Sequence, residues 1–254
     1  METSHRTRVG FLVPPGNWTI EQEIPAFLPE DVSINFNRLS RVDHTNEGEQ
    51  RKLVTADNLN VMANSVGRAA RDLAEASPEM IVYCCTSGSF VNGWAGHVEL
   101  SNKITSDTGV PAITTSTAVL SALKVLGAKK VVMVAPYPEN IIDIEVNFFN
   151  HFDIDIVARR RIDCPTDDDI RAVKHEATAA AVLDAVSDVD EYDAVFISCT
   201  NLQIMPQIAS LEDTLGKPVV TSNQASLWAS LPATSGKPRR PVGQLFNHPF
   251  RPFS

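Results

Sequence analysis

The chain has 254 residues, of which 43% are hydrophobic and 21% are charged, and its formal net charge at pH 7 is −9. This composition predicts a globular protein with one large domain or two small ones, and its acidity argues against nucleic acid or an anionic membrane as a partner. The sequence contains no run of about 18 apolar residues, so no membrane span is predicted. Residues 1–8, METSHRTR, lack the apolar core of a signal peptide.

Short apolar strands alternate with longer helical segments in the first part of the chain. We expect strands at residues 8–13, 32–39, 80–84 and 111–115, and helices at residues 19–28, 45–76, 93–108 and 117–126. Thr19, with Gln22 three residues later, has the spacing of a capping box for the first of these helices. Gly127 ends the last of them.

The pattern then begins again. We expect strands at residues 130–135, 154–162, 194–198 and 218–221, and helices at residues 139–152, 168–189, 202–215 and 224–231. The acidic run at residues 167–169 is typical of a helix N-terminus, where it complements the helix dipole. The segment that follows, residues 232–254, is rich in proline and is predicted to be irregular.

Two pairs of matching segments indicate an internal duplication. RVGFLVPP at residues 8–15 resembles KVVMVAPY at 130–137, and TGVPAITT at 108–115 resembles LGKPVVTS at 215–222. The sequence therefore predicts an α/β fold of two pseudo-symmetric halves, each a four-stranded parallel sheet flanked by helices. We assign residues 1–116 to the first half, 117–231 to the second and 232–254 to a tail; a helix at 117–127 can cross over between the halves.

Two cysteines hold matching places in these halves. Cys85 follows the strand at residues 80–84, Cys199 follows the strand at 194–198, and a hydroxyl residue comes after each. Ligands of open α/β sheets bind beyond the carboxyl ends of the strands. We therefore expect Cys85 and Cys199 to face one cleft between the halves, together with Asn17 and Tyr137, which also follow strands. The same loops supply further side chains that can cap helices or hold a carboxylate: Thr86, Ser87, Thr200 and Asn201.

A thiolate is a strong nucleophile and a usable base, and its pKa falls near a helix N-terminus, where we expect both cysteines. The alternatives are plainer roles: Asn17 as a turn residue or cap, and Tyr137 as a packing residue. Strand alternation turns Cys84 into the core, and Cys164 is predicted to have no role. His97, on a helix, is predicted to face solvent. The four cysteines show neither disulfide nor metal spacing, so we expect reduced thiols in the cytoplasm.

Four motifs in matching order carry a resemblance to a known group. VPPGNWTIEQEIP at residues 13–25 resembles the amino-terminal motif of maleate isomerases, in which an asparagine binds a substrate carboxylate. CTSGSFVNG at 85–93 is more similar to the corresponding stretch of arylmalonate decarboxylases, although the bacterial decarboxylase has glycine in the place of Cys85. SCT at 198–200 and APY at 135–137 match the second catalytic cysteine and the active-site tyrosine. Residues 8–231 thus resemble the aspartate/glutamate racemase superfamily, in its maleate cis-trans isomerase and arylmalonate decarboxylase branch.

The resemblance implies a cofactor-independent isomerase of a small, maleate-like dicarboxylate, with Cys85 as nucleophile and Cys199 as acid and base. It also leaves open a two-cysteine racemase of amino acids or hydantoins and an arylmalonate-type decarboxylase. A different class, a two-lobed protein that binds a small ligand without chemistry, is disfavoured because a carboxylate site needs donors rather than two thiols. The resemblance implies no cofactor or metal, a small carboxylate substrate, no nucleic-acid or membrane partner, and a homo-oligomer, a dimer or higher.

Overall fold

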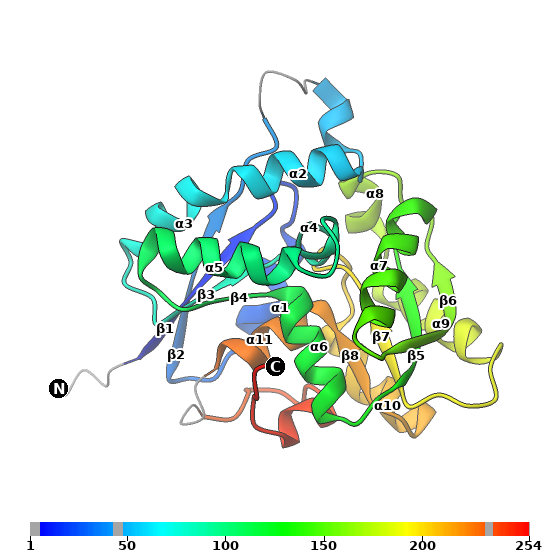
Figure 1. The fold of residues 1–254 in the computed structure, drawn as a ribbon. Helices are drawn as coiled ribbons and strands as arrows, with labels where there is room; N and C mark the ends of the chain where they lie inside the picture. The colour runs from blue at the N-terminus through cyan, green and yellow to red at the C-terminus, as the bar shows by residue number, and fades with distance from the viewer. Residues whose placement is uncertain (1–5, 43–47, 232–235, 254) are drawn as a thin grey trace.

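The protein contains two parallel four-stranded sheets (Figure 1). The computed structural model describes residues 6–42, 48–231 and 236–253. The first sheet has the order β2-β1-β3-β4 and the second the order β6-β5-β7-β8. The strands are β1 (Thr7–Val13), β2 (Val32–Arg38), β3 (Met80–Tyr83), β4 (Ala112–Thr114), β5 (Lys130–Ala135), β6 (Asp155–Arg161), β7 (Ala194–Ile197) and β8 (Val219–Thr221). The predicted α/β fold of two similar halves is confirmed.

Helices cover the sheets and lie between them. In the first half they are α1 (Thr19–Phe27), the 3-10 helix η1 (Gly48–Lys52), α2 (Ala56–Asn64), α3 (Val66–Ala74), α4 (Thr86–Phe90), α5 (Gly96–Thr108) and α6 (Thr115–Val125). They continue with α7 (Glu139–His151), α8 (Asp167–Ala172), α9 (His175–Val186), η2 (Met205–Gln207), α10 (Ile208–Leu215), α11 (Ser222–Ser230) and η3 (Gln244–Asn247). Among the described residues, no helix is long and apolar enough to cross a membrane.

Both of the longest predicted helices are interrupted. The segment predicted at 45–76, whose first residues lie outside the described ones, forms η1, α2 and α3. Thr55 caps α2 by accepting the N–H of Asn58, and the Ser65 hydroxyl donates to the carbonyl of Met62 at 2.7 Å where α2 gives way to α3. The segment predicted at 168–189 is divided because Val173, at ψ 121°, has extended backbone between α8 and α9. Hydrophobic periodicity runs through such breaks and does not reveal them.

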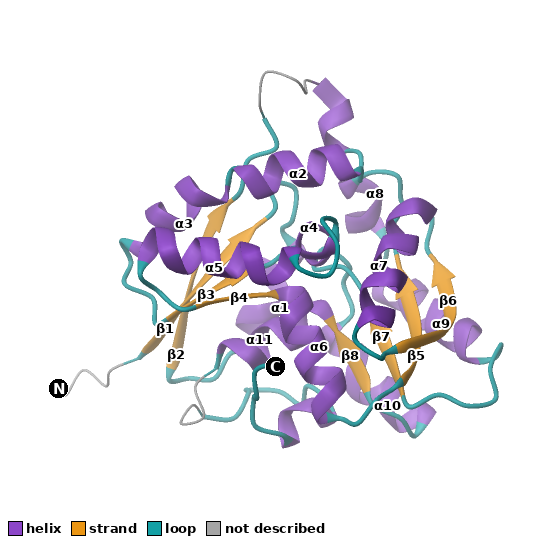
Figure 2. Cartoon of the chain, viewed as in Figure 1, coloured by secondary structure: helices purple, strands orange, loops and turns teal. Residues whose placement is uncertain are grey.

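The halves are joined by α6 and α11, which pack against each other between the two sheets (Figure 2). A hydrogen bond of 2.9 Å links the Thr115 hydroxyl of α6 to the Ser226 hydroxyl of α11. Each of these helices begins directly after the last strand of one sheet, so the carboxyl ends of β4 and β8 are held close together. The loops after β1, β3, β5 and β7 consequently meet between the halves, and the predicted site lies there.

Candidate active site

Cys85 and Cys199 line one enclosed cavity between the halves, at the carboxyl ends of β3 and β7. Every residue that the sequence predicted for the site lines it: Asn17, Cys85, Thr86, Ser87, Tyr137, Cys199, Thr200 and Asn201. The cavity has a volume of about 20 Å³, enough for one water molecule. A substrate therefore enters only when the surrounding segments move apart.

Segments of both halves close this cavity. Val54, between η1 and α2, and Leu59 of α2 line it together with Ile170 of α8. The N–H of Val54 donates to the carbonyl of Pro165 at 3.2 Å, and Lys52 forms an ion pair with Asp168 at 3.1 Å. These contacts lie where η1, α2 and α8 come together (Figure 1). Leu53 and Thr166 also form an isolated β-bridge here, so the cover is bound to the second half by backbone contacts and an exposed ion pair.

Cys85 occupies the predicted junction between a strand and a helix. It is the N-cap residue of α4, where its Sγ accepts the N–H of Gly88 at 3.3 Å, and its Sγ lies 3.8 Å from the Ser87 Oγ. A Cβ at position 88 would lie 2.6 Å from the Tyr83 hydroxyl and 3.0 Å from the Cys85 Sγ. Glycine at 88 is therefore required for the backbone to approach the thiol this closely.

Cys199 is held differently from the prediction. The helix expected from residue 202 begins later, with η2 at Met205 and α10 at Ile208, and Cys199 itself has a φ of 97°. This left-handed conformation is strained for a residue with a side chain, and such strain is concentrated at functional sites. The N–H of Cys199 donates to the Ser222 hydroxyl at 3.1 Å, and its Sγ accepts the N–H of Asn201 at 3.4 Å. The Cys199 sulfur therefore accepts one backbone N–H, that of Asn201, and no helix begins directly after Cys199 in the chain.

Burial, rather than the helix N-terminus, controls the ionisation of both thiols in the closed cavity. Burial raises the pKa of Cys85, and the N–H of Gly88, the Ser87 hydroxyl and the Arg41 charge lower it only in part. Burial also raises the pKa of Cys199 well above its ordinary value, against the N–H of Asn201 and the Tyr137 hydroxyl. In this closed arrangement the pKa of each thiol is therefore raised, whereas the sequence predicted that it would be lowered.

The predicted binding residues are held by bonds that cross between the halves. Asn17 Nδ2 donates to the Thr200 hydroxyl at 2.8 Å, while Asn17 Oδ1 accepts the N–H of Ile20 at 3.2 Å. Asn17 therefore fixes the start of α1, and a second amide N–H remains for a ligand. Thr19 is not the cap; its hydroxyl donates to the carbonyl of Asn201 at 3.0 Å. The Thr86 hydroxyl donates to Ser222 at 2.8 Å.

Arg41 and Asp167 are lining residues that the sequence did not single out. They form a short ion pair across the halves, and their side chains are only 7% and 10% exposed. Both also line a surface hollow of about 390 Å³ with Arg51, Lys52 and Arg171, so the pair separates the catalytic cavity from the outside. Arg41 follows β2 by three residues, and the rule that led to Asn17 and Tyr137 would also have indicated it.

Other residues from the sequence lie away from the cavity. Cys84 is fully buried, as predicted, and Cys164 is buried as well. His97 was expected to face solvent but is 2% exposed. Its Nδ1 lies 2.6 Å from the Thr117 hydroxyl, and its ring contacts Phe148 and Phe152 edge-on. The prediction was wrong because residues of α7 and the turn after it pack on the face of α5 that carries His97.

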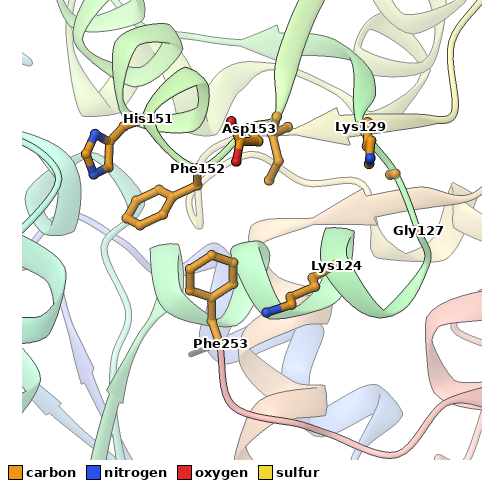
Figure 3. Close-up of a pocket in the computed structure, with 9 residues that line it drawn as sticks. Lys124, Gly127, Lys129, His151, Phe152, Asp153 and Phe253 are labelled. Atoms are coloured by element: carbon orange, nitrogen blue, oxygen red, sulfur yellow. The ribbon is translucent and has the colours of Figure 1, made fainter.

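A larger hollow of about 500 Å³ lies elsewhere, beside the end of α6 and the loop after α7 (Figure 3). Lys124 and Phe253 point toward each other there, with Lys124 Nζ 4.9 Å from the ring centre. Neither Cys85 nor Cys199 lines this hollow. Size alone would therefore misplace the reaction site. Within the described parts of the chain, no three His, Cys, Asp or Glu side chains are grouped to hold a metal ion.

Comparison with known proteins agrees with this geometry. The family model for arylmalonate decarboxylase matches residues 9–246. The chain belongs to this family. A maleate isomerase of Pseudomonas putida is 29% identical over 237 residues, which are 91% of this chain and 93% of that relative. The maleate isomerase Iso from a second Pseudomonas putida strain has a crystal structure with a TM-score of 0.80 and 25% identity, covering 94% of this chain and 97% of that one.

A third comparison concerns the maleate cis-trans isomerase of Nocardia farcinica, in a cysteine-to-serine mutant with a covalently bound succinylcysteine intermediate. It has a TM-score of 0.77 at 22% identity and covers 92% of this chain and 97% of that one. The predicted superfamily and branch are confirmed, and the chain is an enzyme of that branch.

Proposed function

We propose that this enzyme is a cofactor-independent cis-trans isomerase of a small cis-enedioate, such as maleate. In this proposal Cys85 is the nucleophile, and Cys199 is the acid and base. One observation carries it: both thiols line a single closed cavity together with Asn17 and Tyr137. Two thiols on one small ligand serve addition to a double bond followed by proton transfer, and simple binding needs neither.

The reaction balances without any other reactant. The Cys85 thiol first gives its proton to water, and the resulting thiolate forms a C–S bond to one alkene carbon while the π electrons move to the neighbouring carbon and its carboxylate. The Cys199 thiol then gives its proton to that carbon, which leaves a single bond about which the chain rotates. The Cys199 thiolate takes the proton back, the C–S bond breaks, and the trans isomer leaves with Cys85 again a thiolate.

Arg41 supports the first step. Its positive charge lowers the pKa of Cys85, whereas the Asp167 charge raises it. A substrate carboxylate can bind Arg41 in place of Asp167. It would then neutralise the Arg41 charge, as Asp167 does in the closed form. The cations Arg51, Lys52 and Arg171 around the outer hollow favour the approach of a dianion to this pair.

The relatives support the same chemistry. A thiol that adds across the double bond of maleate yields a succinyl thioether, and a succinylcysteine was captured in the Nocardia farcinica enzyme. The family model, in contrast, has the name of a decarboxylase, and the Thr86-Ser87 pair after Cys85 resembles that branch. A decarboxylase of arylmalonates and a two-cysteine racemase are therefore the alternatives that an experiment must separate.

Substrate conversion in deuterated water, followed by NMR, tests the proposal. The purified enzyme is incubated separately with maleate, aspartate, a hydantoin and an arylmalonate. We expect conversion of maleate to fumarate and no release of CO₂ from the arylmalonate. Exchange of Cα–H for deuterium in aspartate or the hydantoin, without conversion of maleate, would favour a racemase. Release of CO₂ from the arylmalonate alone would favour a decarboxylase.

A further inference from the structure

A buried carboxyl group lies behind the active-site tyrosine. Glu145, on α7, has no exposed surface, and its Oε1 is hydrogen-bonded to the Ser198 hydroxyl at 2.6 Å. Ser198 is the residue directly before Cys199 and is itself fully buried. Its Oγ also lies 3.3 Å from the hydroxyl of Tyr137, which lines the cavity together with Cys199 and lowers the pKa of that thiol. Glu145, Ser198 and Tyr137 therefore form a continuous chain from α7 to the cavity that Cys199 lines.

The surroundings of Glu145 are those of a neutral acid. Its Oε2 has no hydrogen-bond partner among the described residues. Arg159, on the neighbouring strand β6, is paired with Glu139 and Asp143 near solvent. A buried carboxylate with one hydrogen bond and no cation is costly, so the group keeps its proton. In agreement, burial raises the pKa of Glu145 to about 8, and the Ser198 hydrogen bond lowers it by less.

Among the described residues, the elements that pack on α7 place no further charged group against Glu145. The α4 segment that packs on α7, Thr86–Phe90, has no charged residue. His97 of α5 contacts the rings of Phe148 and Phe152, and its Nδ1 is bonded to the Thr117 hydroxyl. Tyr137 is the titratable group on which the charge of Glu145 acts. The protonation of Glu145 is therefore transmitted toward the cavity through Tyr137.

Counting protons fixes the direction of the chain. A serine or tyrosine hydroxyl has one proton and can donate one hydrogen bond. When Glu145 holds a proton on Oε1, it donates to Ser198, which leaves the Ser198 proton for Tyr137 and the Tyr137 proton for Cys199. When Glu145 is ionised, Ser198 must donate to Glu145 instead. Tyr137 is then drawn toward Ser198, and a negative charge is added behind Cys199.

We propose that protonated Glu145 is a positioning residue for Cys199, and that it acts by directing the Ser198 and Tyr137 hydroxyl protons toward the Cys199 sulfur. This arrangement stabilises the Cys199 thiolate that remains after Cys199 gives its proton to carbon. The inference rests on the proposed role of Cys199. It concerns the thiol itself, however, and is measured without any substrate.

The test is the rate at which iodoacetamide alkylates Cys199 relative to Cys85, read by peptide mass spectrometry. Both thiols line the same cavity, so the ratio cancels differences in access. In Glu145→Met we expect the ratio at pH 7 to fall about tenfold, as the loss of one hydrogen bond to an ionised group predicts. In Glu145→Gln, whose amide donates permanently, we expect it to stay within about twofold at pH 7. At pH 9, above the Glu145 pKa of about 8, the wild-type carboxyl group is ionised. The alkylation ratio of Glu145→Gln should then exceed the wild-type ratio about tenfold.

A purely structural Glu145 predicts the opposite. Methionine would then fill an apolar site at least as well as a carboxyl group and leave the ratio unchanged, and this result would overturn the proposal. The proposal would also be overturned if the Cys199-to-Cys85 alkylation ratio of Glu145→Gln equalled that of wild type at every pH from 7 to 9. If Glu145→Met does not fold, Ser198→Ala cuts the same chain and must show the same fall. An enzyme that fails to isomerise maleate can still pass this test, so the two proposals fail independently.

Discussion

The Arg41–Asp167 ion pair makes a strong prediction about stability. Both side chains are nearly buried, and the pair joins the loop after β2 to the start of α8 in the other half. Removal of one partner leaves the other charge buried and unpaired, which costs about 3–5 kcal/mol in comparable pairs. We therefore expect Arg41→Met to lower the free energy of unfolding by that amount, measured by urea denaturation at pH 7.

The double variant Arg41→Met/Asp167→Asn provides the decisive comparison. It removes both charges, and we expect it to unfold within about 1 kcal/mol of wild type, because apolar or neutral replacements of buried pairs are often tolerated. The exposed pair Arg68–Asp72 on α3 is the matched control, and Arg68→Met should change stability by less than about 1 kcal/mol. A double variant no more stable than Arg41→Met would refute the reasoning.

The same variants report on the nucleophile. Arg41 lowers the pKa of Cys85 and Asp167 raises it. Alkylation of Cys85 at pH 7 should therefore be slower in Arg41→Met and faster in Asp167→Asn than in wild type. Equal rates in all three proteins would show that the pair does not influence the thiol.

Three further predictions concern residues around the cavity. Asn17→Ala should raise KM and lower kcat, so that kcat/KM falls about tenfold through loss of one carboxylate donor; unchanged kinetics would leave Asn17 only its structural bonds to Thr200 and to the N–H of Ile20. Tyr137→Phe should lower kcat about tenfold with little change in KM, since it removes a hydroxyl that lowers the pKa of Cys199, and an altered KM alone would assign Tyr137 to binding. Burial raises the pKa of Glu23 from 4.5 to about 7, so the folded state holds an extra proton between these values and stability falls as pH rises through that window. Glu23→Gln should show a smaller fall between pH 5 and 7.5 in urea titrations; an identical slope would contradict the assignment.

The sequence predicted the sheets well because most strands are short apolar runs bounded by turn residues, and β2 shows the alternation of apolar and polar residues that is typical of a strand. It also predicted that Cys85, Cys199, Asn17 and Tyr137 lie close together, since the duplication placed all four after strands. The features that it did not predict depend on contacts between residues far apart in the chain. The carboxylate of Glu23, for example, accepts the N–H groups of Ile204 and Met205 at 2.7 and 2.8 Å from 181 and 182 residues away. No local pattern predicts that contact, which holds the loop after Cys199 irregular where a helix was expected.

Ionisation was the least predictable property of the site. A cysteine at a helix N-terminus suggests a lowered pKa, but enclosure in a cavity of about 20 Å³ outweighs the backbone donors. The depth of a side chain depends on segments far away in the chain, here residues 48–59 and 165–170. The extents of the two halves and of the tail, and the oligomeric state, stay predictions.

The most direct test of the two-cysteine chemistry is intact-protein mass spectrometry of Cys199→Ser incubated with maleate. Cys85 should still attack, and water can supply the proton to the neighbouring carbon in place of Cys199. Removal of that proton by the Cys199 thiolate, which the elimination requires, is blocked. We expect a species heavier than the protein by one maleic acid, with the added mass on the peptide that contains Cys85, and no such species in Cys85→Ser. Both variants should lose nearly all activity. Absence of the adduct, together with retained activity in Cys85→Ser, would contradict nucleophilic catalysis by Cys85.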